Sequence, residues 1–170
     1  VFLVGGPGNG KSHQSVRLIN DLDIKLNEEK RIGSTAKRSY FDATNSVLVI
    51  NDATIRDFVG DQPNDLARDL KESISKLKDG GYFLMANINR GILIEEKHAI
   101  ENKDDYEIEL DIINQLLGSK DQESSKVKIM PGCKDSVYFK RHLIKKAEIK
   151  SKHDLYINIV YLDKISLLEK

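Results

Sequence analysis

The chain opens with Val1-Phe2-Leu3-Val4-Gly5-Gly6-Pro7-Gly8-Asn9-Gly10-Lys11-Ser12, and this stretch decides the predicted fold. An apolar run leads directly into the spacing Gly-x-x-x-x-Gly-Lys-Ser. The glycines let the backbone turn tightly enough to direct successive N–H groups at phosphate oxygens. A helix that starts near Lys11 would add its positive end to the same anion. The stretch therefore predicts a loop that binds the phosphates of a nucleoside triphosphate.

Two side chains of this loop have specific roles in the prediction. Lys11 is expected to reach the β- and γ-phosphates, and the Ser12 hydroxyl is expected to hold Mg²⁺. This pattern, the Walker A motif, requires a strand before it and a helix after it, and residues 1–4 and 15–19 can supply them. The residues expected to bind the nucleotide are Gly5, Gly6, Pro7, Gly8, Asn9, Gly10, Lys11, Ser12 and His13.

Composition bounds the class of protein. The 170 residues are enough for one domain with a core, and 27 basic residues balance 27 acidic ones, so the net charge favours neither nucleic acid nor membrane as a partner. The single cysteine, Cys133, cannot form an internal disulfide, which is typical of a reducing cytoplasm. The sequence contains no bilayer-length apolar run and no secretory signal. Because Val1 already belongs to the first predicted strand, we expect a fragment of a longer chain.

A second strand, predicted over residues 46–52, ends in Asn51-Asp52. Its apolar residues 47–50 are typical of a central parallel strand. A carboxylate at the end of such a strand can hold Mg²⁺ beside the phosphate loop, as in the Walker B motif. Asp52 is therefore predicted to hold the metal and polarise water, either alone or in a weaker pair with Asn51. The alternative is that Asp52 only caps the next segment.

A third strand is predicted over residues 82–86, after an amphipathic helix over residues 64–78. Asn89 follows this strand and is the candidate for sensing the γ-phosphate, with Asn87 in reserve. Arg90 could act as an arginine finger that stabilises the negative charge on the phosphates, in a site shared with a neighbouring subunit. The alternative is an Asn-rich turn that carries a solvated arginine.

The remaining elements complete an α/β prediction. We expect a three-layer phosphate-loop (P-loop) domain: a parallel sheet with helices on both faces, a core over residues 1–125, and a strand-rich extension of the same domain over residues 126–170. The predicted helices cover residues 11–21, with Val16, Ile19 and Leu22 on the apolar face, and 104–117, ending at Gly118; residues 94–98 are a weaker candidate. The predicted strands of the extension cover residues 127–130, 136–139, 147–149 and 156–162.

Three families of nucleotide-binding proteins compete for this pattern. The segment from Gly5 to Gln14 resembles the opening of adenylate kinases, but the chain has too few arginines to clamp two phosphate groups. Asp57–Gly60 and Asn102–Asp105 match GTPase motifs outside the required structural context. Residues 83–90 resemble the sensor-1 strand of AAA+ and STAND-like ATPases, which commonly ends Thr-Asn-Arg, and this resemblance covers residues 1–91.

A more specific resemblance is to the ATPase subunit of phosphorothioation-dependent DNA restriction systems. It rests on residues 49–55, 87–93 and 161–169. It implies a bacterial antiviral role in a multi-subunit complex that acts on DNA. A basic stretch over residues 140–153 could contact a nucleic-acid backbone, or it could be the solvent-exposed face of a β-hairpin.

These observations together predict a Mg²⁺-dependent ATPase module of a larger protein. Its expected cofactors are ATP and Mg²⁺, and its expected partners are other protein subunits, a second copy of itself, and DNA reached indirectly. The expected catalytic residues are Lys11, Asn51, Asp52, Asn89 and Arg90, and the expected metal ligands are Ser12 and Asp52. The alternative is a nucleotide-gated binding or scaffold module with little turnover.

Overall fold

The computed structural model describes residues 1–21, 39–42, 46–51, 53, 65–76, 83–118, 127–129 and 139–164. Within these ranges the helices are α1 (Lys11–Asp21), α2 (Asp65–Lys76), α3 (Arg90–Ile100) and α4 (Glu107–Leu117), with short 3₁₀ turns η3 (Asp104–Tyr106) and η4 (Leu162–Lys164). The strands are β1 (Phe2–Val4), β2 (Ser39–Asp42), β3 (Val47–Ile50), β4 (Phe83–Ile88), β5 (Val127–Ile129), β6 (Phe139–Ile144) and β7 (Leu155–Tyr161).

The described strands form one mixed sheet in an α/β fold. Its order is β2-β3-β4-β1-β7-β6-β5. The four central strands, β3, β4, β1 and β7, run parallel, whereas β2, at one edge, and β6 and β5, at the other, pair antiparallel. The carboxyl ends of β1, β3, β4 and β7 therefore lie at the same edge of the sheet.

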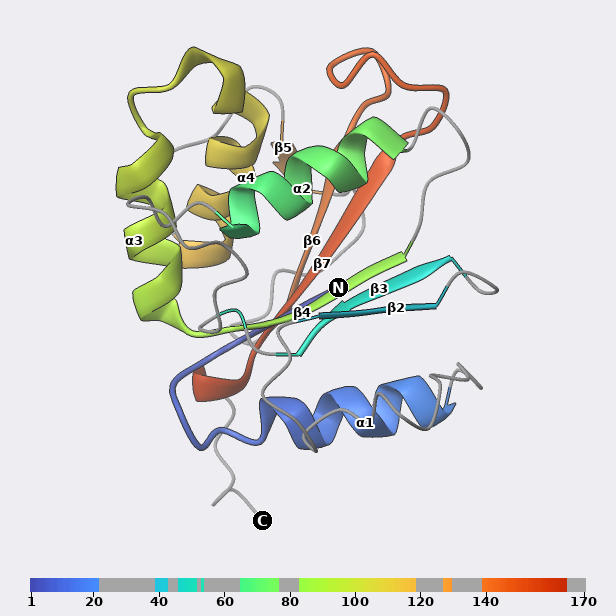
Figure 1. Cartoon of the computed structure of the whole chain (residues 1–170), viewed down its shortest axis with the longest axis vertical. Helices are drawn as coiled ribbons and strands as arrows, with labels where there is room; N and C mark the ends of the chain where they lie inside the picture. Colours follow the sequence, from blue (N-terminus) through green and yellow to red (C-terminus); the bar gives the residue numbers. More distant parts are fainter. Residues whose placement is uncertain are drawn as a thin grey trace.

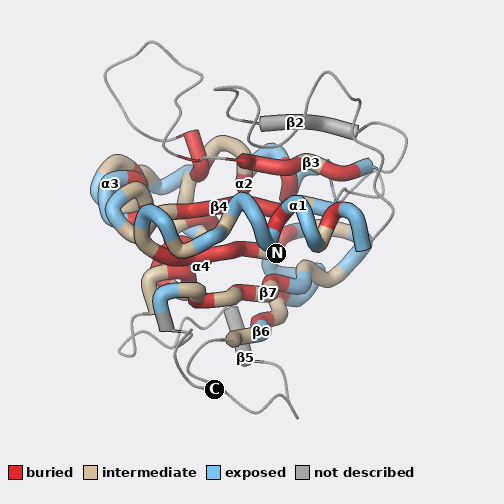
Figure 2. The backbone as a smooth tube through the Cα atoms, turned by 90° about the horizontal axis from the view of Figure 1, so that it is seen from below, coloured by how far each residue is buried: buried red, intermediate tan, exposed pale blue. Residues whose placement is uncertain are grey.

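Helices cover both faces of this sheet. Figure 1 shows α1 on one side and α2, α3 and α4 on the other. The larger apolar cluster joins the three helices to the sheet, and a smaller cluster joins Ile19 of α1 to Val47, Val49 and Met85. The central strands are buried along most of their length, and α1 exposes its outer side to solvent (Figure 2). No helix in the described ranges has both the length and the apolar character needed to cross a bilayer.

Several predicted elements are confirmed. The strand before the loop, the helix over residues 11–21 and the strand over residues 47–50 form as expected. The helix over residues 104–117 forms as a 3₁₀ turn followed by α4, and Gly118 ends it with φ 73°. The unit β3–α2–β4 joins two parallel strands, which is the predicted strand–helix–strand arrangement.

Other predictions about local structure are wrong. Val16 is 37 % exposed, and the buried residues of α1 are Ser15 and Ile19. Residues 147–149 lie in a turn rather than a strand. Of the strand expected over residues 136–139, residues 136–138 lie outside the described ranges and Phe139 begins β6. The edge strand β2 was not predicted, because its segment is polar and poorly periodic. The expected apolar residue Leu22 lies outside the described residues.

The most consequential difference concerns residues 87–91: the strand was predicted to end at residue 86, with an Asn-rich turn as the alternative for the residues that follow. Strand β4 continues through Asn87 to Ile88, and α3 begins at Arg90. Both asparagines therefore have a defined place: Asn87 lies within a central strand, and Asn89 is the residue between that strand and the helix.

Candidate functional site

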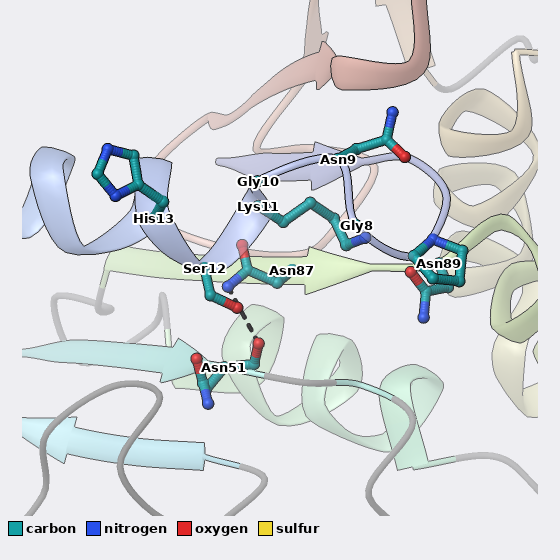
Figure 3. A pocket seen from close by; sticks show the side chains of 10 residues that line it. Gly8, Asn9, Gly10, Lys11, Ser12, His13, Asn51, Asn87 and Asn89 are labelled. Atoms are coloured by element: carbon teal, nitrogen blue, oxygen red, sulfur yellow. Dashed lines mark hydrogen bonds between the residues drawn. The ribbon is translucent and has the colours of Figure 1, made fainter.

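The candidate site lies where the carboxyl ends of three neighbouring strands meet. Strand β4 pairs with β1 on one side and with β3 on the other. The loop after β1 leads into α1, so the start of this helix lies beside the ends of β3 and β4. A cavity of about 420 Å³ opens there, lined by residues 7–13 of the loop and by Asn51, Asn87 and Asn89 (Figure 3).

The loop has the backbone shape that its glycines permit. Gly8 and Gly10 have φ values of 78° and 71°, in the left-handed region that other residues enter only at a cost. No atom lies within 4 Å of a Cβ built on either glycine, so conformation rather than space requires glycine at these two positions. The loop then delivers Lys11 as the first residue of α1.

The ammonium group of Lys11 lies over its own loop. Its Nζ donates to the carbonyl oxygens of Gly5, at 3.2 Å, and Gly6, at 2.7 Å. The Asn9 amide, oriented to satisfy its neighbours, donates to the carbonyl oxygens of Gly6, at 2.9 Å, and Pro7, at 3.2 Å. Gly5 and Gly6 therefore contribute carbonyl groups to the loop, while Pro7 to His13 line the cavity itself.

The three asparagines that line the cavity differ in how their side chains are used. Asn87 accepts from the Ser15 hydroxyl at 2.6 Å and donates to the Asn51 carbonyl oxygen at 3.0 Å. The Oδ1 atoms of Asn51 and Asn89 are buried and have no hydrogen-bond partner among the described residues. A buried carbonyl oxygen without a donor is costly, so these two atoms favour a ligand or water that can donate or a cation that they can coordinate.

Of the remaining predicted site residues, Asp52 is not described and Arg90 does not line the cavity. Asp52, the predicted metal ligand and base, lies outside the described residues, as do the GTPase-like residues 57–60. Arg90 is described and lies away from the cavity lining: its guanidinium forms an ion pair with Asp163 and donates to the Leu117 carbonyl oxygen at 3.1 Å. The predicted role of Arg90 toward a neighbouring subunit stays a prediction.

The structure also adds a residue that the sequence patterns did not single out. Ser15 is fully buried and lies one helical turn after Lys11, whose carbonyl oxygen its hydroxyl also reaches at 3.0 Å. The i, i+4 spacing from Lys11 was the available signal, but nothing in the sequence indicated that Asn87 would lie opposite.

The described part of the chain shows no group of three or more His, Cys, Asp or Glu side chains that could hold a metal ion. The oxygen atoms of Ser12 and Asn51 at the cavity are of the kind that Mg²⁺ prefers. Comparison of the chain with protein-family models, with curated proteins and with solved structures found no match.

Proposed function

We propose that this chain is a three-layer P-loop domain that binds ATP with Mg²⁺ and hydrolyses it as a module of a larger protein. One observation carries the proposal: a glycine loop with two left-handed residues leads into α1 and lines a cavity that also receives the ends of β3 and β4. A helix start of this kind attracts anions through its free N–H groups and its dipole. The unpartnered Oδ1 atoms of Asn51 and Asn89 supply an independent reason to expect a ligand there.

The residues present fit a nucleoside triphosphate. The loop N–H groups and Lys11 would hold its phosphates, and Ser12, with Asp52 as the predicted carboxylate, would hold Mg²⁺. Bound Mg²⁺ would neutralise charge on the phosphates. Reaching the phosphates requires Lys11 Nζ to exchange the carbonyl oxygens of Gly5 and Gly6 for phosphate oxygens, which is favourable because a charged acceptor binds an ammonium more strongly.

Hydrolysis requires a group that orients or deprotonates water. Among the described residues that line the cavity there is no carboxylate, and an asparagine amide such as that of Asn51 or Asn89 can orient water but cannot take its proton. We assign the base of the proposed reaction to Asp52, the carboxylate that the sequence predicts after Asn51. This same observation favours the second candidate function, a nucleotide-gated binding module with little turnover.

Titration calorimetry with ATP and Mg²⁺ tests the binding proposal. We expect Lys11→Ala to weaken binding at least about tenfold, because a charge-assisted contact to phosphate contributes roughly 1.5–3 kcal/mol. Lys76→Ala is the matched control: Lys76 lies on the opposite face of the sheet in an exposed pair with Glu72, so binding should be unchanged. Equal binding by Lys11→Ala and wild type would refute the proposed role of the loop.

Single-turnover phosphate release separates the two candidate functions. If the domain is an ATPase, Asp52→Asn should release phosphate at least about a hundredfold more slowly than wild type while still binding ATP. If wild type and Asp52→Asn release phosphate equally slowly, the binding module is the correct assignment. A phosphate-release rate that rises on addition of DNA would support the role in DNA restriction that the sequence resemblance implies, and an unchanged rate would count against it.

A further inference from the structure

A series of buried hydrogen bonds beside the cavity connects three elements: α1, β4 and the residue that follows β3. Ser15 of α1 donates to Asn87 Oδ1 at 2.6 Å, and Asn87 Nδ2 donates to the Asn51 carbonyl oxygen at 3.0 Å. The exposed fractions of Ser15, Asn87 and Asn51 are 0 %, 3 % and 6 %. Figure 3 shows the Asn87 side chain between Asn51 and the start of α1.

The orientation of this amide is determined by its partners. If the Asn87 oxygen and nitrogen were exchanged, its oxygen would face the carbonyl oxygen of Asn51, and two acceptors would meet without a hydrogen. Both polar atoms of the amide are thus committed to the protein. The protein thus fixes the orientation of the Asn87 side chain, whereas the Oδ1 atoms of Asn51 and Asn89 have no hydrogen-bond partner among the described residues.

Asn87 also extends the pairing of two strands beyond their ladder. The last register pair of β3 and β4 is Ile50 with Ala86. Past that pair, the Asn87 side chain donates to the Asn51 carbonyl, and the Asn87 carbonyl accepts from the Ala53 N–H at 3.3 Å. The positions of Asn51 and Ala53 relative to α1 thus depend on Asn87.

We infer that Asn87 is a positioning residue that couples phosphate binding at the start of α1 to the end of β3. The inference rests on the proposed function of the loop. A ligand that orders the first turn of α1 also restrains Ser15, one turn along the same helix. Through Asn87 this restraint reaches Asn51 and the segment that leads to Asp52. The coupling links the two halves of the site through hydrogen bonds within the protein.

Hydrogen exchange followed by mass spectrometry tests the coupling, with ATP affinity measured separately by calorimetry. In wild type, saturating ATP and Mg²⁺ should slow exchange in the peptide that spans Val47 to Ala53. Ser15→Ala removes the hydrogen bond between Ser15 and Asn87, and Asn87→Leu removes this bond and the one to the Asn51 carbonyl oxygen. We expect the factor by which ATP and Mg²⁺ slow exchange in this peptide to be at least about fivefold smaller in each variant than in wild type. Ser15→Ala should change ATP affinity by less than about threefold.

The matched control is Ser73→Ala on α2. Ser73 is also buried, and its hydroxyl donates to the Asp69 carbonyl oxygen, one turn earlier, at 2.6 Å. This variant should retain the full slowing by ATP. Wild-type slowing in both Ser15→Ala and Asn87→Leu, or an equal loss in Ser73→Ala, would overturn the inference and leave ATP binding intact. Failure of wild type to bind ATP in the calorimeter would instead refute the proposed function, and the inference with it.

Discussion

Arg90 and Asp163 form a two-point ion pair that joins the start of α3 to the turn after β7. Arg90 Nε lies 2.6 Å from Asp163 Oδ2, and a terminal guanidinium nitrogen lies 3.3 Å from Oδ1. The same guanidinium lies 5.2 Å from the centre of the Tyr161 ring. Arg90 directly follows Asn89, so this pair anchors the end of β4 at the rim of the candidate site.

Arg90→Ala should lower the free energy of unfolding by about 1–2 kcal/mol. The pair is only 30 % and 27 % exposed, and the variant also loses the bond to the Leu117 carbonyl. Urea denaturation measures the change. Asp105→Asn, which breaks the more exposed pair with Lys71, is the control and should cost less than about 1 kcal/mol. Loss of ATP hydrolysis in Arg90→Ala at unchanged stability would instead support the predicted role toward a neighbouring subunit.

Gly10→Ala should destabilise the domain by about 1–2 kcal/mol and weaken ATP binding, because the left-handed backbone at φ 71° disfavours a side chain. Gly91→Ala is the matched control. Gly91 lies in the first turn of α3 with open space around a built Cβ, so alanine there should stabilise the domain by about 0.5–1 kcal/mol. Urea denaturation and ATP titration of both variants check this prediction, and equal effects would contradict it.

Glu96→Ala should destabilise the domain by about 2–3 kcal/mol, because it removes a buried carboxylate that caps another helix. Glu96 Oε1 and Oε2 accept from the N–H groups of Leu66, at 3.2 Å, and Ala67, at 3.1 Å, at the start of α2. The exposed neighbour Glu95 is the control, and Glu95→Ala should change stability by less than about 0.5 kcal/mol. Guanidinium denaturation measures both, and equal costs would show that the cap contributes nothing specific.

The stability of the domain should respond to pH through Glu109. Burial raises the pKa of this carboxyl above 4.5, and the charge of Lys71 lowers it only in part. In the pH range just above 4.5, the folded state therefore binds more protons than the unfolded state, so this group's contribution to stability falls as pH rises through the folded pKa.

Glu109→Gln should remove that pH dependence and stabilise the domain at pH 7, by less than about 1 kcal/mol. Thermal unfolding between pH 4 and pH 8 measures the slope for both proteins. Glu107→Gln, at an exposed position of the same helix, is the control for the change from carboxylate to amide. A steeper fall of stability with pH in Glu109→Gln would contradict the prediction.

Local patterns in the sequence determined the loop and most of the elements around it. Gly8 and Gly10 predict a left-handed turn because few other residues tolerate one, and this depends on no distant residue. The apolar spacing of Leu66, Leu70 and Ile74 likewise predicts a buried face of α2, and all three are buried. Predictions of this kind succeed because turn chemistry and helical periodicity act over a few residues.

Tertiary structure alone decided which of the polar residues meet. The strand was predicted to end at residue 86, but β4 continues through Asn87 to Ile88, because Leu3 and Val4 of β1 pair with these two residues. Ser15 and Asn87 are 72 positions apart, and Glu96 lies about thirty positions from the helix start that it caps. Such contacts depend on the order of the strands and on which helices cover each face. Short-range periodicity carries no information about that order, because it records only which face of an element is apolar.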